Sequence, residues 1–142
     1  MPVFEYSSSF PCSVERLWAF HERPDIIRLL TPPFPPVRII GQSGGLEVGS
    51  EKEFALGVWP FEKRWLARHV EYEHGVLFAD LQVSGPFRAW LHRHMFAAEG
   101  AGSRLTDHVE YEFYGGPWVD RVVRWQLGSL FRHRHAATRK CA

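Results

Sequence analysis

The sequence predicts an α+β fold in which a curved antiparallel sheet of about seven strands wraps around one long C-terminal helix. Three observations support this prediction. Short segments of strand character, separated by Gly- and Pro-containing turns, fill residues 37–114. A helical period of apolar residues follows from Trp118 to about Thr138. One strand and two short helices precede the first of the closely spaced strands.

The N-terminal region has the pattern of a strand followed by two short helices. Residues 3–10 alternate in the manner of a strand, and Ser13 is a suitable N-cap for the helix that begins after it. Pro24 ends that helix, and residues 25–30 form the second one. The proline-rich residues 32–36 cannot be helix or central strand, so we expect an extended loop there.

Six further strands are predicted, with short turns that include Ser43-Gly44-Gly45, Trp59-Pro60 and His74-Gly75. They span residues 37–40, 50–58, 61–73, 76–83, 88–98 and 104–114. The first of them is expected to close at Gly41. Parallel neighbours need long crossovers, so connections this short require antiparallel pairing. We see no internal repeat or linker, and therefore expect residues 1–142 to form a single domain.

The C-terminal helix is predicted to pack on the sheet through an apolar stripe. That stripe contains Val119, Val122, Val123, Gln126, Leu127, Leu130 and Phe131. Trp18, Trp118 and Trp125 are assigned to the core or to helix packing. Because a single long helix must cover the concave face of a large sheet, we expect space between the two, and such a concave apolar gap is a natural ligand site.

Composition excludes several classes of protein. The 142 residues carry a net charge of +1, which argues against a dedicated nucleic-acid binder. No apolar run approaches 18 residues, and no secretory signal is visible, so we expect no integral membrane association and a cytoplasmic location. Cys12 and Cys141 lie near opposite ends of the chain; a disulfide between them is possible, but free thiols are the simpler expectation. The chain is expected to be a monomer or a weak dimer.

A motif in the later strands resembles a known superfamily. It reads Phe78-x-Asp80-x-Gln82-x-x-Gly85-Pro86-Phe87-x-x-Trp90-x-His92-x-His94-x-Phe96, followed by Leu105-x-Asp107-x-Val109-x-Tyr111. It is similar to bacterial ligand-binding proteins of the START-like (SRPBCC) helix-grip superfamily, and most of all to their polyketide-cyclase-like, CoxG-like branch. The resemblance implies a helix-grip fold and the binding of a hydrophobic small molecule, such as a lipid. It offers no catalytic signature and implies no cofactor, and since the superfamily also contains enzymes, chemistry does not transfer with the fold.

Strand alternation predicts which side chains face the gap. The last strand carries polar residues typical of a solvent-facing side on one face, so its other face points inward. In the two preceding strands, the face that carries the motif residues is likewise expected to point inward. The predicted ligand-binding residues are Phe54, Trp65, Phe78, Asp80, Gln82, Trp90, His92, His94, Phe96, Asp107, Val109, Tyr111 and Leu127. Aromatic side chains would supply apolar contact, and the His and Asp side chains would orient a polar group of the ligand.

The two histidines and two aspartates admit three interpretations. They can form a hydrogen-bonded network that lines a pocket, since buried polar groups need partners. Two histidines two residues apart on one strand can also ligate a metal, with Asp80, His69 or Asp107, but His-x-His alone is weak evidence and we predict no metal. His92, His94, Asp80 and Asp107 are the candidate catalytic residues if a His–Asp pair acts as acid and base.

We therefore predict that the chain binds, carries or senses a hydrophobic or aromatic small molecule in a cavity between the sheet and the C-terminal helix. The alternative is a cyclase, dehydratase or isomerase acting on a polyketide-like substrate. A third possibility is an accessory protein whose cavity is filled by side chains and whose surface binds a partner.

Overall fold

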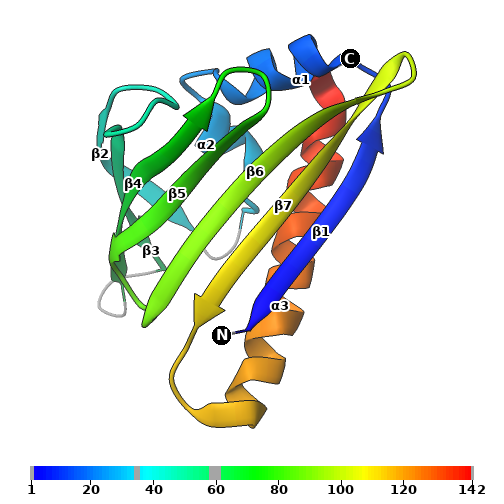
Figure 1. Ribbon diagram of the computed structural model, residues 1–142. Coiled ribbons are helices and arrows are strands. Elements are labelled where there is room, and N and C mark those ends of the chain that lie inside the picture. The colour runs from blue at the N-terminus through cyan, green and yellow to red at the C-terminus, as the bar shows by residue number, and fades with distance from the viewer. Residues whose placement is uncertain (1, 34–35, 58–61, 142) are drawn as a thin grey trace.

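The computed structural model describes residues 2–33, 36–57 and 62–141 (Figure 1). Seven antiparallel strands form one sheet in the order β1-β7-β6-β5-β4-β3-β2. The strands are β1 (Val3–Phe10), β2 (Val37–Ser43), β3 (Glu51–Leu56), β4 (Lys63–Glu73), β5 (Leu77–Ser84), β6 (Ala89–Glu99) and β7 (Gly102–Glu112). The predicted α+β fold with a curved seven-stranded sheet is confirmed. The predicted Trp59-Pro60 turn, and residues 34–35 of the proline-rich loop, lie outside the described residues.

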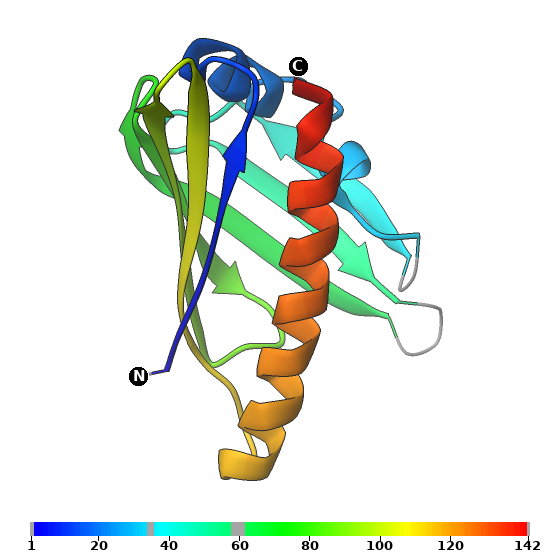
Figure 2. The same ribbon diagram turned by 90° about the vertical axis from the view of Figure 1, so that its right-hand side faces the viewer.

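Three α-helices and a short terminal turn complete the fold. They are α1 (Val14–His21), α2 (Ile26–Leu30), α3 (Gly116–Thr138) and the 3₁₀ turn η1 (Arg139–Cys141). Ser13 caps α1 as predicted, because its side chain accepts a hydrogen bond from the backbone N–H of Arg16 at 3.2 Å. The long helix α3 runs along the concave side of the sheet, while α1 lies at the end of the molecule where α3 finishes (Figure 2).

Several strand boundaries differ from the prediction by one to three residues, as β2 and β7 illustrate. Strand β2 does not close at Gly41 but continues to Ser43, with a shift of register against β3 between Ile39 and Gly41. A β-bulge of this kind lets a strand pass through an irregular position without ending. Strand β7 starts at Gly102, because the turn before it occupies only Gly100 and Ala101, and it ends at Glu112.

Burial alternates along β6 and β7, so the predicted inward faces of these two strands are confirmed. The inner faces carry Trp90, His92, His94 and Phe96 on β6, and Leu105, Asp107, Val109 and Tyr111 on β7. Two hydrophobic clusters result. The first gathers Trp18, Phe20, Phe78 and Phe96 beneath α1, and the second gathers Trp65, Trp90, Val109 and Phe131 between the sheet and α3.

Helix α3 buries a narrower stripe than the sequence predicted. Its buried residues are Val123, Leu127, Phe131, His135 and Thr138. Val122 and Gln126 point outward, and Trp118 and Trp125 are exposed over 78% and 73% of their surface, so their assignment to packing was wrong. Figure 1 shows that the start of α3 extends beyond the end of the sheet.

Cys12 and Cys141 form a disulfide that the sequence did not predict, since both were expected to be free thiols. Their Cα atoms are 6.0 Å apart, although 129 positions separate them in the chain. The topology explains the pairing, because β1 delivers Cys12 to the end of the molecule at which α3 delivers Cys141 (Figure 1). None of the described helices has the length and apolar character needed to cross a membrane.

Candidate functional site

A cavity of about 220 Å³ lies between the inner face of the sheet and the helices α2 and α3. One part of its wall is apolar, with Phe54, Leu56, Trp65, Phe87, Trp90, Leu127 and Leu130. The other part is polar, with His21, Lys52, His69, Asp80, His92, His94 and Arg134. The cavity is therefore amphipathic, with aromatic rings on one part of its wall and a dense group of ionisable side chains on another.

Eight of the predicted ligand-binding residues line this cavity. They are Phe54, Trp65, Phe78, Asp80, Trp90, His92, His94 and Leu127. Trp65 packs edge-to-face on Trp90 with ring centroids 5.1 Å apart, and Phe87 contacts both rings. Strand alternation predicted Trp65 and Trp90 in this apolar wall, but not Phe87, which lies in the β5–β6 turn.

Five predicted residues lie off the lining. The Gln82 side chain donates to and accepts from the backbone of Phe87, which orients the β5–β6 turn rather than the cavity. Phe96 packs against Trp18 in the first cluster. Val109 is fully buried, and the Tyr111 hydroxyl donates to Asp120 at 2.7 Å. Asp107 is also buried, behind the histidines that line the cavity.

Asp107 is the centre of the polar network. Its Oδ1 accepts hydrogen bonds from His92 Nε2 at 2.7 Å and from His94 Nδ1 at 3.2 Å. Its Oδ2 accepts from His135 Nε2 at 2.6 Å, and His135 Nδ1 in turn lies 2.7 Å from the Ser8 hydroxyl. Burial alone would raise the pKa of Asp107, but the three imidazole hydrogen bonds outweigh burial and hold it well below its usual range.

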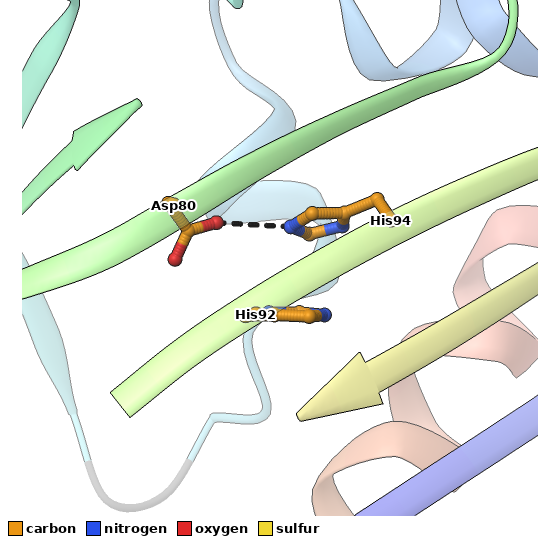
Figure 3. A group of neighbouring side chains, drawn as sticks. All are labelled: Asp80, His92 and His94. Carbon is orange, nitrogen blue, oxygen red and sulfur yellow. Dashed lines mark hydrogen bonds and ion pairs between the residues drawn. The ribbon is translucent and has the colours of Figure 1, made fainter. Parts of the chain in front are cut away.

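His94 is placed between two carboxylates and carries a positive charge. Its Nε2 lies 2.9 Å from Asp80 Oδ2 (Figure 3), and its Nδ1 lies 3.2 Å from Asp107 Oδ1. Ionised carboxylates only accept hydrogen bonds, so both ring nitrogens must donate. Burial acts to lower the pKa of His94, but the bonds to Asp107 and Asp80 prevail and raise it. Burial acts to raise the pKa of Asp80, but the bond from His94 and the electrostatic attraction of the neighbouring imidazoles together outweigh it and lower the pKa of that carboxyl.

His92 lies beside His94, but its pKa is shifted in the opposite direction. The two rings stack with centroids 3.7 Å apart, and Figure 3 shows them side by side on β6. Burial, together with the charge on His94, lowers the pKa of His92 despite its bond to Asp107. Because Nε2 donates to Asp107, a neutral His92 leaves Nδ1 as an acceptor. His92 is thus a neutral imidazole with a fixed tautomer at the cavity wall.

Two other histidines in the lining are bonded to backbone carbonyls. His69 Nδ1 donates to Leu46 at 2.8 Å, and His21 Nδ1 donates to Leu17 at 2.9 Å. Burial is the main cause of a lowered pKa in both, and it brings the pKa of His21 to about 4. Both rings are therefore neutral at pH 7.

Four polar residues of the site were missed by sequence reasoning: His21, Lys52, Arg134 and His135. A signal existed for three of them, and for His21 it is its place on the same helical face as Val14, Leu17 and Trp18. Lys52 lies two positions before Phe54 on a strand, and Arg134 lies seven positions after Leu127 on a helix, so each shares a face with a residue that was predicted to point inward. His135 gave no such signal, because its place in the last turn is also what the helix dipole favours.

Donor atoms of Asp80, His92 and His94 lie within 4.8 Å of one another, which is a spacing that a metal ion could use. The hydrogen bonds already in place compete with such a use. Both His94 nitrogens contact carboxylates, and a metal would have to displace the proton from one of them. The arrangement fits an internal ion-pair network better than a vacant metal centre.

The comparisons with known proteins agree with this architecture. A START superfamily protein from Mycobacterium smegmatis superposes with a TM-score of 0.72 at 10% identity, over 97% of this chain and 94% of that one. A protein from Thermus thermophilus gives 0.68 at 15% identity, over 99% and 93%. The chain therefore has the START-like (SRPBCC) helix-grip fold.

A third structure is a nucleoside-diphosphate sugar epimerase from Corynebacterium glutamicum, with a TM-score of 0.73 and 25% identity. The match covers 96% of this chain but only 28% of the epimerase, so it concerns one part of that enzyme. Residues 36–141 match the family described as "Domain of unknown function (DUF8410)", and the chain belongs to that family. No curated protein matches the chain.

Proposed function

We propose that residues 1–142 act as a single ligand-binding domain that holds a hydrophobic or aromatic small molecule in the cavity between the sheet and α3. The observation that carries the proposal is the amphipathic lining. An aromatic wall built from Trp65, Trp90 and Phe87 faces the same space as a fixed group of polar side chains. Ligand sites in proteins have this composition, mostly apolar with a few placed polar groups.

The size of the cavity limits the ligand. A cavity of about 150 Å³ accommodates benzene, and this one measures about 220 Å³. The space suits one aromatic ring with a short substituent, or a compact bicyclic ring, when the side chains stay where they are. Aromatic pairing with Trp65 and Trp90 would contribute on the order of 0.5–1.5 kcal/mol beyond the burial of apolar area.

The test of this proposal places a larger side chain in the cavity by a substitution on α3. Leu127 is buried in the lining, whereas Val122 on the same helix is 52% exposed. We expect Leu127→Trp to weaken binding of neutral 2-naphthamide at least tenfold in calorimetry, because the indole would occupy the ligand's space. Val122→Trp, the matched control, should bind as the unchanged protein does. Equal affinity in a folded Leu127→Trp variant would contradict the proposal.

An acid–base enzyme is a second candidate, and one observation favours it. His92 lines the cavity as a neutral imidazole, with its tautomer fixed by Asp107, as a general base requires. The same contacts also satisfy a purely structural network, so binding without turnover is the simpler proposal. The polyketide-cyclase-like branch, the monomeric or weakly dimeric state and the absence of a nucleic-acid partner stay predictions. The cytoplasmic location also stays a prediction. The Cys12–Cys141 disulfide argues against it, because disulfides persist mainly in oxidising compartments.

A further inference from the structure

Two cationic side chains line the cavity without a hydrogen-bond or ion-pair partner among the described residues. Lys52 on β3 is only 8% exposed, and the described residues provide neither a hydrogen bond nor an ion pair for its ammonium group. Arg134 on α3 has an Nε that is shielded from solvent and has no acceptor within the described part of the chain. Both residues line the cavity that the proposed function assigns to the ligand.

Most arginines on the outer face of the sheet differ from Lys52 and Arg134, because they form ion pairs with carboxylates. These pairs are Arg38–Glu62, Arg64–Glu53, Arg68–Glu51, Arg93–Glu71 and Arg104–Glu99. Inside the cavity the carboxylates are already engaged, since Asp80 and Asp107 are bonded to histidines. The arginines of these pairs have carboxylate partners, whereas Lys52 and Arg134 have no such partner among the described residues, so their hydrogen-bonding capacity is free for a ligand.

The charges around the cavity leave room for one anion. Asp80 and Asp107 are negative, and Lys52, Arg134 and the protonated His94 are positive. Burial lowers the pKa of Lys52, the charge of Asp80 opposes this effect and that of Arg134 adds to it, so these groups act on one another across the cavity. An unpaired buried cation is costly, and a monoanion held between Lys52 and Arg134 would remove that cost.

We infer that Lys52 and Arg134 form an anion subsite that takes the carboxylate of a small aromatic carboxylic acid, whose ring lies against Trp65 and Trp90. This inference rests on the proposed function and narrows its ligand class. A carboxylate matches the planar donors of the Arg134 guanidinium, and its single charge matches the excess of one positive charge. The apolar part of the lining matches the ring.

The experiment compares two isosteric probes, 2-naphthoate and 2-naphthamide, by calorimetry at pH 7. We expect the unchanged protein to bind naphthoate at least tenfold more tightly, because hydrogen bonds to charged groups are among the stronger ones in proteins. Lys52→Met and Arg134→Met should each reduce that preference at least threefold while leaving the affinity for naphthamide within about threefold. Lys63→Met and Arg132→Met, which alter exposed cations on β4 and α3, should keep the preference unchanged.

The outcomes separate this inference from the proposed function. Equal affinity for the two probes, or a preference that survives both cavity variants, overturns the anion subsite but leaves the binding function intact. Failure of both probes to bind the unchanged protein overturns both proposals. Because the two variants alter different elements, β3 and α3, a folding defect in one leaves the other to decide the result.

Discussion

Two groups of polar side chains lie in or directly behind the wall of the same cavity and differ in one respect. In the His–Asp group, Asp107 accepts from three imidazoles and Asp80 accepts from His94, so the carboxylates have partners within the protein. In the other group, Lys52 and Arg134 have no such partner among the described residues. A polar group that is satisfied internally shapes and stiffens a wall, whereas an unsatisfied one has a free energy to gain from a ligand.

This difference divides the cavity wall by role. The His–Asp group spans β5, β6, β7 and α3, so it ties the helix to the sheet beneath the cavity. The cationic pair comes from β3 and α3, which face one another across the space. We therefore propose that the His–Asp group holds the cavity wall in shape and that Lys52 and Arg134 bind a charged group of the ligand. Separate variants test the two roles.

The largest effect is expected from removing the carboxylate at the centre of the first group. Asp107→Ala leaves His92, His94 and His135 without their shared acceptor and leaves the charge of His94 partly uncompensated. Breaking a buried charged pair by removing one partner typically costs about 3–5 kcal/mol. We expect a loss of that size in the free energy of unfolding, measured by urea denaturation at pH 7.

Asp80→Asn is the comparison for this variant, because Asp80 accepts from one imidazole only and its side chain is 18% exposed. Its loss should be clearly smaller. If Asp107→Ala costs less than Asp80→Asn, the centre of the network lies elsewhere and the division into two groups fails.

The next effect concerns pH and His21, which belongs to neither group. Its folded pKa of about 4 lies below the unfolded value of about 6.5. Between these values the unfolded chain holds a proton that the folded chain lacks, so acid favours unfolding. The stabilisation is complete above about pH 6.5 and is lost as the pH falls to about 4. His21→Met should lose about 2–3 kcal/mol less than the unchanged protein between pH 7 and pH 4, measured by denaturation at each pH.

His133→Met provides the control for the pH series, because His133 is exposed on α3 and should leave the pH dependence unchanged. His94 acts in the opposite sense, since its pKa is raised. Its stabilising contribution is complete below about pH 6.5 and is lost as the pH rises through the raised value. A His21→Met series that runs parallel to that of the unchanged protein would show that another histidine causes the acid sensitivity.

The sequence predicted the sheet side of the site well and the helix side poorly. Side chains alternate strictly along a strand, so placing His92 and His94 inward required only the correct strand and one buried neighbour. The register of α3 depends on how the helix docks, which no local pattern determines. The predicted stripe therefore included Val123, Leu127 and Phe131, which are buried, but also Val122 and Gln126, which point outward, and it omitted the buried His135.

Two further features depended on long-range geometry. The Cys12–Cys141 pairing follows from the positions at which β1 and α3 end, and two cysteines alone cannot indicate it. The unpaired state of Lys52 depends on which carboxylates are already engaged, and that requires the His–Asp contacts to be known first. Charge and composition give the number of ionisable groups but not which of them remain without a partner.

The smallest effect is a gain in stability, and it addresses the cationic group directly. Lys52→Met replaces a buried cation that has no ion-pair partner among the described residues with an apolar side chain of similar length, so the free energy of unfolding should rise by about 1 kcal/mol at pH 7. Lys63→Met, an exposed lysine on β4, should stay within about 0.5 kcal/mol of the unchanged protein. A loss of stability in Lys52→Met would mean that the ammonium group stabilises the folded protein, which would contradict its assignment to an anion subsite. A gain, together with a thermal shift by 2-naphthoate that is present in the unchanged protein and reduced in Lys52→Met, would mean that the chain gives up stability at Lys52 in exchange for ligand recognition.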